Sequence, residues 1–301
     1  MALGGDVFCW TADEQTSCLV LDEYVRTGGN FIDTADVYSA WAPDHTGGES
    51  ESVIGRWLKR SGCRDELVIA SKVGKKPDRP GLSEESVAKA VGESLSRLGI
   101  SELDLYYAHE DDLAMPIDEK AGVFSSLVDS GDIRAIGVSN FSARRLESWV
   151  QASRANAYHP PVAVQPLYNL MERGFERLER DVARAAGLAV IPYSALAGGF
   201  LSGKYRSGSR ADSARTDGTS AYSVGRGPAV TAALKAIAGQ QNVPIASVAI
   251  AWLRAQPTVV APISSARRLD QLPALIAGAR LVLTTAEISV LQDVSDPVPG
   301  A

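Results

Sequence analysis

The chain has 301 residues, of which 45% are hydrophobic, so it is long enough to bury a large core. Its net charge of −6 argues against nucleic acid or an anionic membrane surface as the main partner. It contains no secretory signal pattern, no apolar stretch near the roughly 20 residues that span a bilayer and no paired cysteine spacing, so we expect a cytoplasmic protein with reduced thiols.

Short apolar runs alternate with segments of helical period along the whole chain. The expected strands are Met1–Leu3, Phe31–Ile32, Leu67–Ala70, Leu103–Tyr107, Ile133–Val138, Val162–Val164, Leu188–Ile191 and Thr258–Ala261. Because these runs are continuously apolar and helices separate them, they indicate a parallel sheet that is buried on both faces. Eight such strands favour an α/β fold of the closed (β/α)8 TIM barrel type, forming one domain over residues 1–301. An open doubly wound sheet is the alternative.

Capping signals predict where several helices begin and end. Thr11 and Glu14 have the spacing of a capping box and predict the start of the first helix. Gly62 follows an amphipathic segment and predicts its end. Thr284 and Glu287 repeat the capping-box spacing near the C-terminus and predict the start of the last helix.

One stretch, residues 205–227, breaks the alternation. It is rich in Gly, Ser and Arg and has no hydrophobic period. An irregular segment of this length in a compact domain is usually either a lid over a site or a disordered connection. The sequence leaves both interpretations open for this loop.

Polar residues stand at the carboxyl ends of three consecutive apolar runs, where a barrel gathers them around one pocket. Asp33 follows the second run, Lys72 the third and His109 the fourth, and Tyr38 lies in the loop after the second. Each of them alone could have a structural role, but four at successive strand ends indicate a shared site. No metal site is expected, because the three histidines are scattered along the chain.

This set of side chains is suited to proton transfer by the phenol of Tyr38. A free tyrosine has a pKa of about 10, which is too high for an efficient acid at neutral pH. A nearby ammonium group lowers that pKa, and a carboxylate beside the ammonium keeps it charged and in place. Asp33, Lys72 and Tyr38 would form this relay. His109 would donate a hydrogen bond to a substrate oxygen or share in the proton movement.

Several motifs, in a constant order, carry a resemblance to a known family. They are "GGNFIDTADVYS", "GGESESVIGRWL", "VIASKVG", "LDLYYAH", "IGVSNFS", "VQPLYNL" and "IPYSALAGGFLSGKY". With them, nearly the whole chain resembles the aldo-keto reductase superfamily. Its members are (β/α)8 barrels that reduce aldehydes or ketones with a reduced nicotinamide cofactor. The resemblance implies that the catalytic tetrad is Asp33, Tyr38, Lys72 and His109.

The resemblance also implies where the cofactor binds, and the chain has no G-x-G-x-x-G motif to support a Rossmann site instead. Ser139, Asn140 and Gln165 would hold the nicotinamide carboxamide, and Tyr193 would stack on the ring. Further implied contacts are Ser194, Leu196, Gly198, Ser202, Lys204, Ser265, Arg267 and Gln271.

The segment after the last strand predicts which nicotinamide nucleotide binds. Ser265, Arg267 and Gln271 stand at the predicted start of a helix, where an anionic group is favourably placed. A planar guanidinium also binds a phosphate through two hydrogen bonds. We therefore predict NADP(H) rather than NAD(H), with Arg267 contacting the additional phosphate. The alternative is that Arg267 and Arg268 form a surface arginine pair without a ligand.

The sequence differs from the family pattern at its start, and it does not specify the substrate. Family members usually begin with a hairpin that plugs the bottom of the barrel, and we expect this chain to lack it. Trp10 and Trp41 follow the first two strands and could wall a substrate pocket or pack structurally. The acids at 110–112 could raise the pKa of His109 or be solvated.

The leading hypothesis is an oxidoreductase that uses NADPH to reduce an aldehyde or ketone to the alcohol, with the reverse oxidation possible. Its expected partner is a small-molecule carbonyl substrate. The alternative is a non-catalytic regulatory subunit that senses nicotinamide nucleotides with the same barrel. The intact tetrad favours the enzyme, because a protein that only binds the nucleotide has no need of a proton relay.

Overall fold

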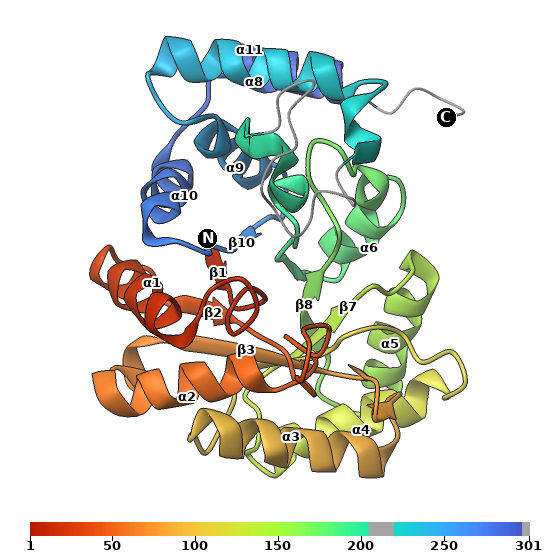
Figure 1. The fold of residues 1–301 in the computed structure, drawn as a ribbon. Coiled ribbons are helices and arrows are strands. Elements are labelled where there is room, and N and C mark those ends of the chain that lie inside the picture. The colour runs from red at the N-terminus through yellow and green to blue at the C-terminus, as the bar shows by residue number, and fades with distance from the viewer. Residues whose placement is uncertain (205–219, 297–301) are drawn as a thin grey trace.

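The computed structural model describes residues 1–204 and 220–296. Its centre is an eight-stranded sheet with the order β10-β1-β2-β3-β6-β7-β8-β9, and every neighbouring pair in it is parallel. Figure 1 shows helices surrounding these strands. The strands are β1 (Ala2–Gly4), β2 (Phe31–Asp33), β3 (Val68–Val73), β6 (Leu105–Ala108), β7 (Ile136–Ser139), β8 (Pro161–Gln165), β9 (Ala189–Val190) and β10 (Ile263–Ser264). A separate hairpin pairs β4 (Lys75–Lys76) with β5 (Arg79–Pro80).

Backbone hydrogen bonds between β9 and the segment before β10 close the sheet. Val190 donates its N–H to the carbonyl of Thr258 at 3.0 Å, and Val260 donates to the carbonyl of Val190 at 2.9 Å. The same segment continues into β10, which pairs with β1. The fold is therefore the predicted (β/α)8 barrel, and the open-sheet alternative is wrong.

Three predicted strand positions need correction. The last strand is β10, not Thr258–Ala261, which contributes only an isolated bridge to β9. β6 and β7 begin later than predicted, because Leu103 and Ile133 form only an isolated bridge with each other. Both residues are buried, so the apolar run begins before the hydrogen-bonded ladder does. Burial without pairing is therefore the reason why the starts of β6 and β7 were predicted too early.

Helices connect the strands and cover the outside of the barrel (Figure 1). The α-helices are α1 (Glu14–Arg26), α2 (Glu49–Ser61), α3 (Glu84–Leu98), α4 (Ile117–Asp129), α5 (Ala143–Ala155), α6 (Glu179–Ala185), α8 (Gly227–Gln241), α9 (Ile245–Arg254), α10 (Leu272–Arg280) and α11 (Thr285–Ser295). Short 3₁₀ helices are η1 (Arg64–Glu66), η2 (Gly174–Glu176), η3 (Ala197–Ser202), η4 (Ser220–Ser223) and η5 (Leu269–Gln271).

The capping predictions are right for the last helix and wrong for the first. Thr284 and Glu287 form a complete capping box at the start of α11. At α1, however, the N-cap is Asp13, whose carboxylate accepts the N–H of Thr16 at 2.8 Å, and not Thr11. Both residue types cap well, and the point where the backbone turns into the helix decides between them.

Part of the loop 205–227 has regular structure, contrary to the prediction. Ser220–Ser223 forms η4, and Tyr222 in this helix donates a hydrogen bond to the carboxylate of Glu172 at 2.6 Å. The last part of the predicted loop is thus tied to the segment that follows β8. Residues 205–219 lie outside the described residues, and so does the choice between a lid and a disordered connection.

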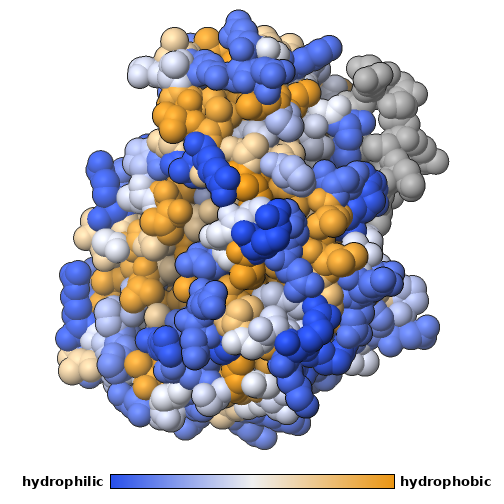
Figure 2. All heavy atoms as spheres, turned by 90° about the vertical axis from the view of Figure 1, so that its left-hand side faces the viewer, coloured by the Kyte–Doolittle hydropathy of each residue, from blue (hydrophilic) through white to orange (hydrophobic). Residues whose placement is uncertain are grey.

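Among the described residues, no single helix is both long and apolar enough to cross a membrane. Leu269–Arg280 and Thr285–Ser295 meet that length and composition only as a pair, across a bend of 113°. Figure 2 shows the face that carries α1 and α10, where hydrophobic side chains gather in the upper part. Leu269 and Val282, which flank α10, are exposed. Hydrophilic side chains divide the apolar areas of this face.

Side chains fill the inside of the barrel, and a glycine on β7 leaves room for one of them. The buried inner residues are Ala2, Ala70, Leu105, Tyr107, Ala163, Ile191, Ala261 and Ile263. Gly137 on β7 lies against the Tyr107 ring, and a Cβ at this position would be 2.3 Å from a ring carbon. A glycine is therefore required at position 137 for Tyr107 to occupy the barrel interior.

Gly137→Ala should destabilise the protein by about 1–3 kcal/mol, because the added methyl group overlaps the buried Tyr107 ring. The measurement is chemical denaturation followed by circular dichroism. Gly92→Ala is the matched control, because a Cβ at Gly92 on α3 meets no atom within 4 Å. This control should be neutral or stabilising by up to about 1 kcal/mol. Equal stability of Gly137→Ala and the wild type would contradict the packing argument.

Candidate active site

The carboxyl ends of β2, β3 and β6 bring the four predicted catalytic side chains together. Asp33 is the last residue of β2, Lys72 is the last but one of β3, and His109 directly follows β6. Tyr38 lies in the loop after β2. Because β3 pairs with both β2 and β6, these side chains reach one site from adjacent strands. The convergence that the strand-end pattern predicted is therefore present in the structure.

Lys72 is at the centre of this group. Its ammonium donates hydrogen bonds to the carboxylate of Asp33 at 2.5 Å, the carbonyl of Thr34 at 2.8 Å and the hydroxyl of Tyr38 at 2.8 Å. The side chains of Asp33 and Lys72 are completely buried. Gln165 donates to the other carboxylate oxygen of Asp33 at 2.8 Å. The buried ion pair is thus compensated by hydrogen bonds on both sides, which is the condition for burying two charges.

His109 presents a neutral imidazole to this site. Burial lowers the pKa of His109 well below its usual range, and the ammonium groups of Lys72 and Lys75 act in the same direction. The His109 ring centroid lies 6.2 Å from that of Tyr38. Within the described residues, Nδ1 of His109 is buried and has no hydrogen-bond partner. The imidazole therefore stays uncharged at neutral pH.

The acids that follow His109 do not raise its pKa, contrary to one of the two expectations for residues 110–112. Glu110 forms an ion pair with Lys75 at 3.1 Å, and Asp111 forms one with Arg145 at 2.5 Å. These carboxylates are engaged with cations, and the pKa of His109 is lowered by its burial.

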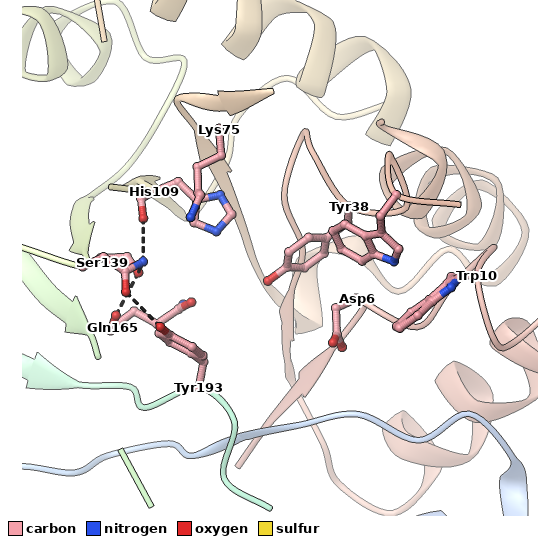
Figure 3. A pocket seen from close by; sticks show the side chains of 10 residues that line it. Asp6, Trp10, Tyr38, Lys75, His109, Ser139, Gln165 and Tyr193 are labelled. Atoms are coloured by element: carbon pink, nitrogen blue, oxygen red, sulfur yellow. Dashed lines mark hydrogen bonds between the residues drawn. The ribbon is translucent and has the colours of Figure 1, made fainter. Parts of the chain in front are cut away.

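Tyr38 and His109 line a cavity of about 390 Å³, shown in Figure 3. The two predicted substrate residues, Trp10 and Trp41, form part of its wall. Their rings meet edge to face with centroids 5.6 Å apart, and the Tyr38 ring lies 6.0 Å from that of Trp41. One side of the cavity is therefore aromatic.

The predicted nicotinamide contacts form a hydrogen-bonded wall in the same cavity (Figure 3). The hydroxyl of Ser139 donates to the carbonyl of Gln165 at 2.8 Å. The amide of Asn140 donates to the carbonyl of His109 at 2.9 Å, and the hydroxyl of Tyr193 donates to the Asn140 side-chain oxygen at 2.9 Å. Ser139 and Gln165 end β7 and β8, so the same strand-end geometry places them here.

The other predicted cofactor residues lie in two segments that follow β9 and β10. The first segment contains Ser194, Leu196, Gly198, Ser202 and Lys204, around η3. In the second, the hydroxyl of Ser265 donates a hydrogen bond to Asp6, which lines the cavity. The backbone N–H of Arg267 donates to the side chain of Gln271 at 3.0 Å. The second segment thus reaches the edge of the cavity. Within the described residues, the cavity wall includes no predicted cofactor residue of either segment.

Two charged residues of the cavity wall, Asp6 and Lys75, were not predicted. Asp6 follows β1, and Lys75 follows β3 as the first residue of β4. The rule that polar residues after barrel strands face the pocket makes both of them candidates, but it does not show which way their side chains point.

The sequence profile of the Aldo/keto reductase family matches residues 1–296. The chain belongs to this family. The family is one of oxidoreductases, and the resemblance drawn from the sequence motifs is confirmed.

Three relatives illustrate the match. The chain is 30% identical to aldo-keto reductase str7 of Strobilurus tenacellus, over 93% of this chain and 82% of that protein. It is 30% identical to the uncharacterized oxidoreductase YrpG of Bacillus subtilis, over 100% of this chain and 93% of that protein. It is also 30% identical to aldo-keto reductase yakc of Schizosaccharomyces pombe, whose name includes NADP(+), over 95% of this chain and 84% of that protein.

In this aldo/keto reductase a second buried carboxylate lies on the loop that carries Tyr38. Asp36 is completely buried, and neither of its carboxylate oxygens has a hydrogen-bond partner among the described residues. Burial raises the pKa of Asp36 to about 7, with a further contribution from Glu51, while Arg97 and two other nearby cations oppose the shift. Asp36 is therefore half ionised near neutral pH.

Asp36→Asn should stabilise the protein more at pH 8 than at pH 5. The pKa of Asp36 is raised on folding from about 4, so ionisation above that pH costs folding free energy, and the cost levels off above pH 7. The gain at pH 8 approaches about 4 kcal/mol. Denaturant titrations at both pH values measure it. Asp44→Asn, which removes a carboxyl at an exposed position, is the matched control, and the pH dependence of Asp36→Asn should exceed that of this control. A pH-independent effect of Asp36→Asn would contradict the raised pKa.

Proposed function

We propose that this aldo/keto reductase reduces an aldehyde or a ketone to the alcohol with NADPH, and that it can catalyse the reverse oxidation. The contact of the Lys72 ammonium with the Tyr38 hydroxyl at 2.8 Å carries this proposal. A buried cation that touches a phenol at the wall of a cavity makes that phenol a proton donor for a bound carbonyl.

The polar wall of the cavity fits the nicotinamide part of the cofactor. The hydroxyl of Ser139 and the amides of Asn140 and Gln165 are the kinds of group that bind a carboxamide, and the flat ring of Tyr193 lies beside them. When bound, the reduced nicotinamide supplies the hydride for the carbonyl carbon. The chain's own task is then to hold the substrate and to deliver the proton.

Tyr38 is the proposed proton donor in the reduction. As negative charge develops on the carbonyl oxygen, the Tyr38 hydroxyl protonates it and the phenolate remains. The Lys72 ammonium stabilises that phenolate through their 2.8 Å hydrogen bond. Asp33 holds the ammonium charged and in place from its other side. In the oxidation direction the phenolate accepts the proton of the alcohol.

His109 is proposed to orient the carbonyl oxygen toward Tyr38. Its imidazole is neutral because its pKa is lowered by burial, so it adds no net charge to the cavity. A neutral imidazole N–H donates a hydrogen bond to the oxygen without competing with Tyr38 as the acid. This assignment separates the proton donor from the group that positions the substrate.

Tyr38→Phe should lower kcat for NADPH-dependent reduction of 4-nitrobenzaldehyde by roughly 10²- to 10⁴-fold, because it removes the proton donor. Binding of NADPH, measured by fluorescence, should be retained. Tyr158→Phe, at a tyrosine outside the cavity wall, is the matched control and should keep wild-type turnover. Full activity of Tyr38→Phe would refute the assignment. A wild-type protein that binds NADPH but reduces no carbonyl compound would favour the regulatory subunit instead.

We also infer that the nucleotide is NADP(H) rather than NAD(H). Arg267 precedes η5 and α10, and its backbone N–H is held by Gln271, so its position is restrained. A guanidinium near the start of a helix suits the additional phosphate of NADP(H). The NADP(+) in the name of the yakc relative supports this choice.

Arg267→Ala should weaken NADPH binding by roughly 10- to 100-fold and leave NADH binding nearly unchanged, because only NADPH has the phosphate that the guanidinium would contact. Fluorescence titration of both nucleotides is the measurement. Arg268→Ala is the control, since Arg268 is exposed and already paired with Asp270 at 2.9 Å. Equal affinity of the wild type for the two nucleotides, or unchanged NADPH binding by Arg267→Ala, would defeat the inference.

A further inference from the structure

Lys75 is a charged residue of the cavity wall that the proposed proton relay does not use. It is the first residue of β4 and lines the same cavity as Tyr38 and His109. In Figure 3 its side chain extends beside the His109 ring, and its charge acts on that imidazole. A positive charge thus stands next to the place where the substrate carbonyl would bind.

The ion pair of Lys75 with Glu110 can be replaced by another anion at a small cost in stability. Lys75 pairs with Glu110 at 3.1 Å, and the two side chains are 39% and 48% exposed. Exposed pairs of this kind contribute little to stability, because water screens both charges and the long side chains lose freedom. Glu110 is not part of the cavity wall, whereas Lys75 is. An anion inside the cavity can therefore take the place of Glu110.

The charges of the wall are separated, so an anion is favoured at one side only. Asp6 lines the cavity on the other side of Tyr38 from Lys75 (Figure 3). Its carboxylate accepts a hydrogen bond from Ser265. The His109 imidazole beside Lys75 is uncharged. A substrate anion would thus be attracted toward Lys75 and repelled from Asp6.

The aromatic side of the cavity indicates what the rest of the substrate is. Trp10, Trp41 and Tyr38 present their rings to one another edge to face, with neighbouring centroids 5.6 and 6.0 Å apart. Such a wall packs well against a flat ring. A cavity of about 390 Å³ that also receives the nicotinamide leaves room for a small substrate.

We propose that the preferred substrates are aromatic aldehydes or ketones that carry a carboxylate on the ring, with Lys75 as the residue that binds the carboxylate. This proposal rests on the proposed reductase function and adds the substrate class. Lys75 determines specificity and takes no part in the transfer of the proton or the hydride.

Two pairs of aldehydes test the proposal, because a nitro group has nearly the shape of a carboxylate without its net charge. The pairs are 4-carboxybenzaldehyde with 4-nitrobenzaldehyde and the corresponding 3-substituted compounds. The quantity to compare is the ratio of kcat/KM for the acid to kcat/KM for its nitro partner. The acid and its nitro partner differ in intrinsic reactivity. This difference is the same for every variant, so it cancels when the ratio is compared between variants.

In at least one pair, Lys75→Gln should lower the ratio by roughly 10- to 100-fold, because it removes a charge-assisted hydrogen bond to the carboxylate. Lys75→Glu should lower it further, and Glu110→Gln should raise it, since the competing carboxylate is removed. Lys89→Gln, which removes an exposed lysine on α3, is the matched control and should keep the wild-type ratio. Added salt should reduce the ratio in the wild type more than in Lys75→Gln.

Ratios that stay within about twofold of the wild type in both Lys75 variants would overturn this proposal and leave the reductase function standing. Failure of the wild-type protein to reduce any of the four aldehydes would instead overturn the reductase function. In that case, calorimetric measurement of benzoate binding tests the role of Lys75 separately. Equal affinity of the wild type and of Lys75→Glu for benzoate would overturn the proposal that Lys75 binds a carboxylate.

Discussion

The buried ammonium of Lys72 is the interaction on which the rest of the site depends. An uncompensated cation in the interior would cost several kcal/mol, so the fold must bring acceptors to it. Asp33, Thr34 and Tyr38 supply three, all from β2 and the loop that follows. Gln165 at the end of β8 then holds Asp33 from across the barrel. The site therefore requires both the pairing of β2 with β3 and the curvature that brings β8 within reach.

Two buried carboxylates, Asp33 at the end of β2 and Asp36 in the loop that follows, have opposite surroundings. Both oxygens of Asp33 are hydrogen-bonded, and an ammonium lies 2.5 Å away. Asp36 is equally buried, but its oxygens have no partner among the described residues, and its pKa is raised to about 7. Its backbone N–H is nevertheless bonded to the carbonyl of Lys72 at 3.2 Å. The loop that positions Tyr38 thus starts from a carboxylate, Asp33, that is held by hydrogen bonds on both oxygens. It also contains a carboxylate, Asp36, whose ionisation is unfavourable. Costs of this kind are common near functional sites.

The sequence pattern predicted the polar residues at the ends of strands. It did not predict Asp6 and Lys75, the charged residues that lie in the segments after β1 and β3. Asp33 and His109 stand directly where an apolar run stops, so the pattern marks them. Lys75 comes after the strand, in the first residue of a hairpin, where the pattern does not show which way a side chain points. The last strand was placed too early because the predicted run 258–261 is mostly apolar, while the ladder with β1 forms only at Ile263 and Ser264.

By itself, the sequence determined the alternation of strands and helices, the barrel class and the four side chains that meet in the candidate active site. These features are encoded locally, in the period of apolar residues and in the residue types that end each run. Only the tertiary structure decided which distant groups meet. Gln165 and Asp33 are 132 residues apart, and Ser265 and Asp6 are 259 apart. Such contacts depend on strand register and on closure of the barrel, which no local pattern specifies. The same dependence explains why the charges of the cavity wall became visible only in the folded protein.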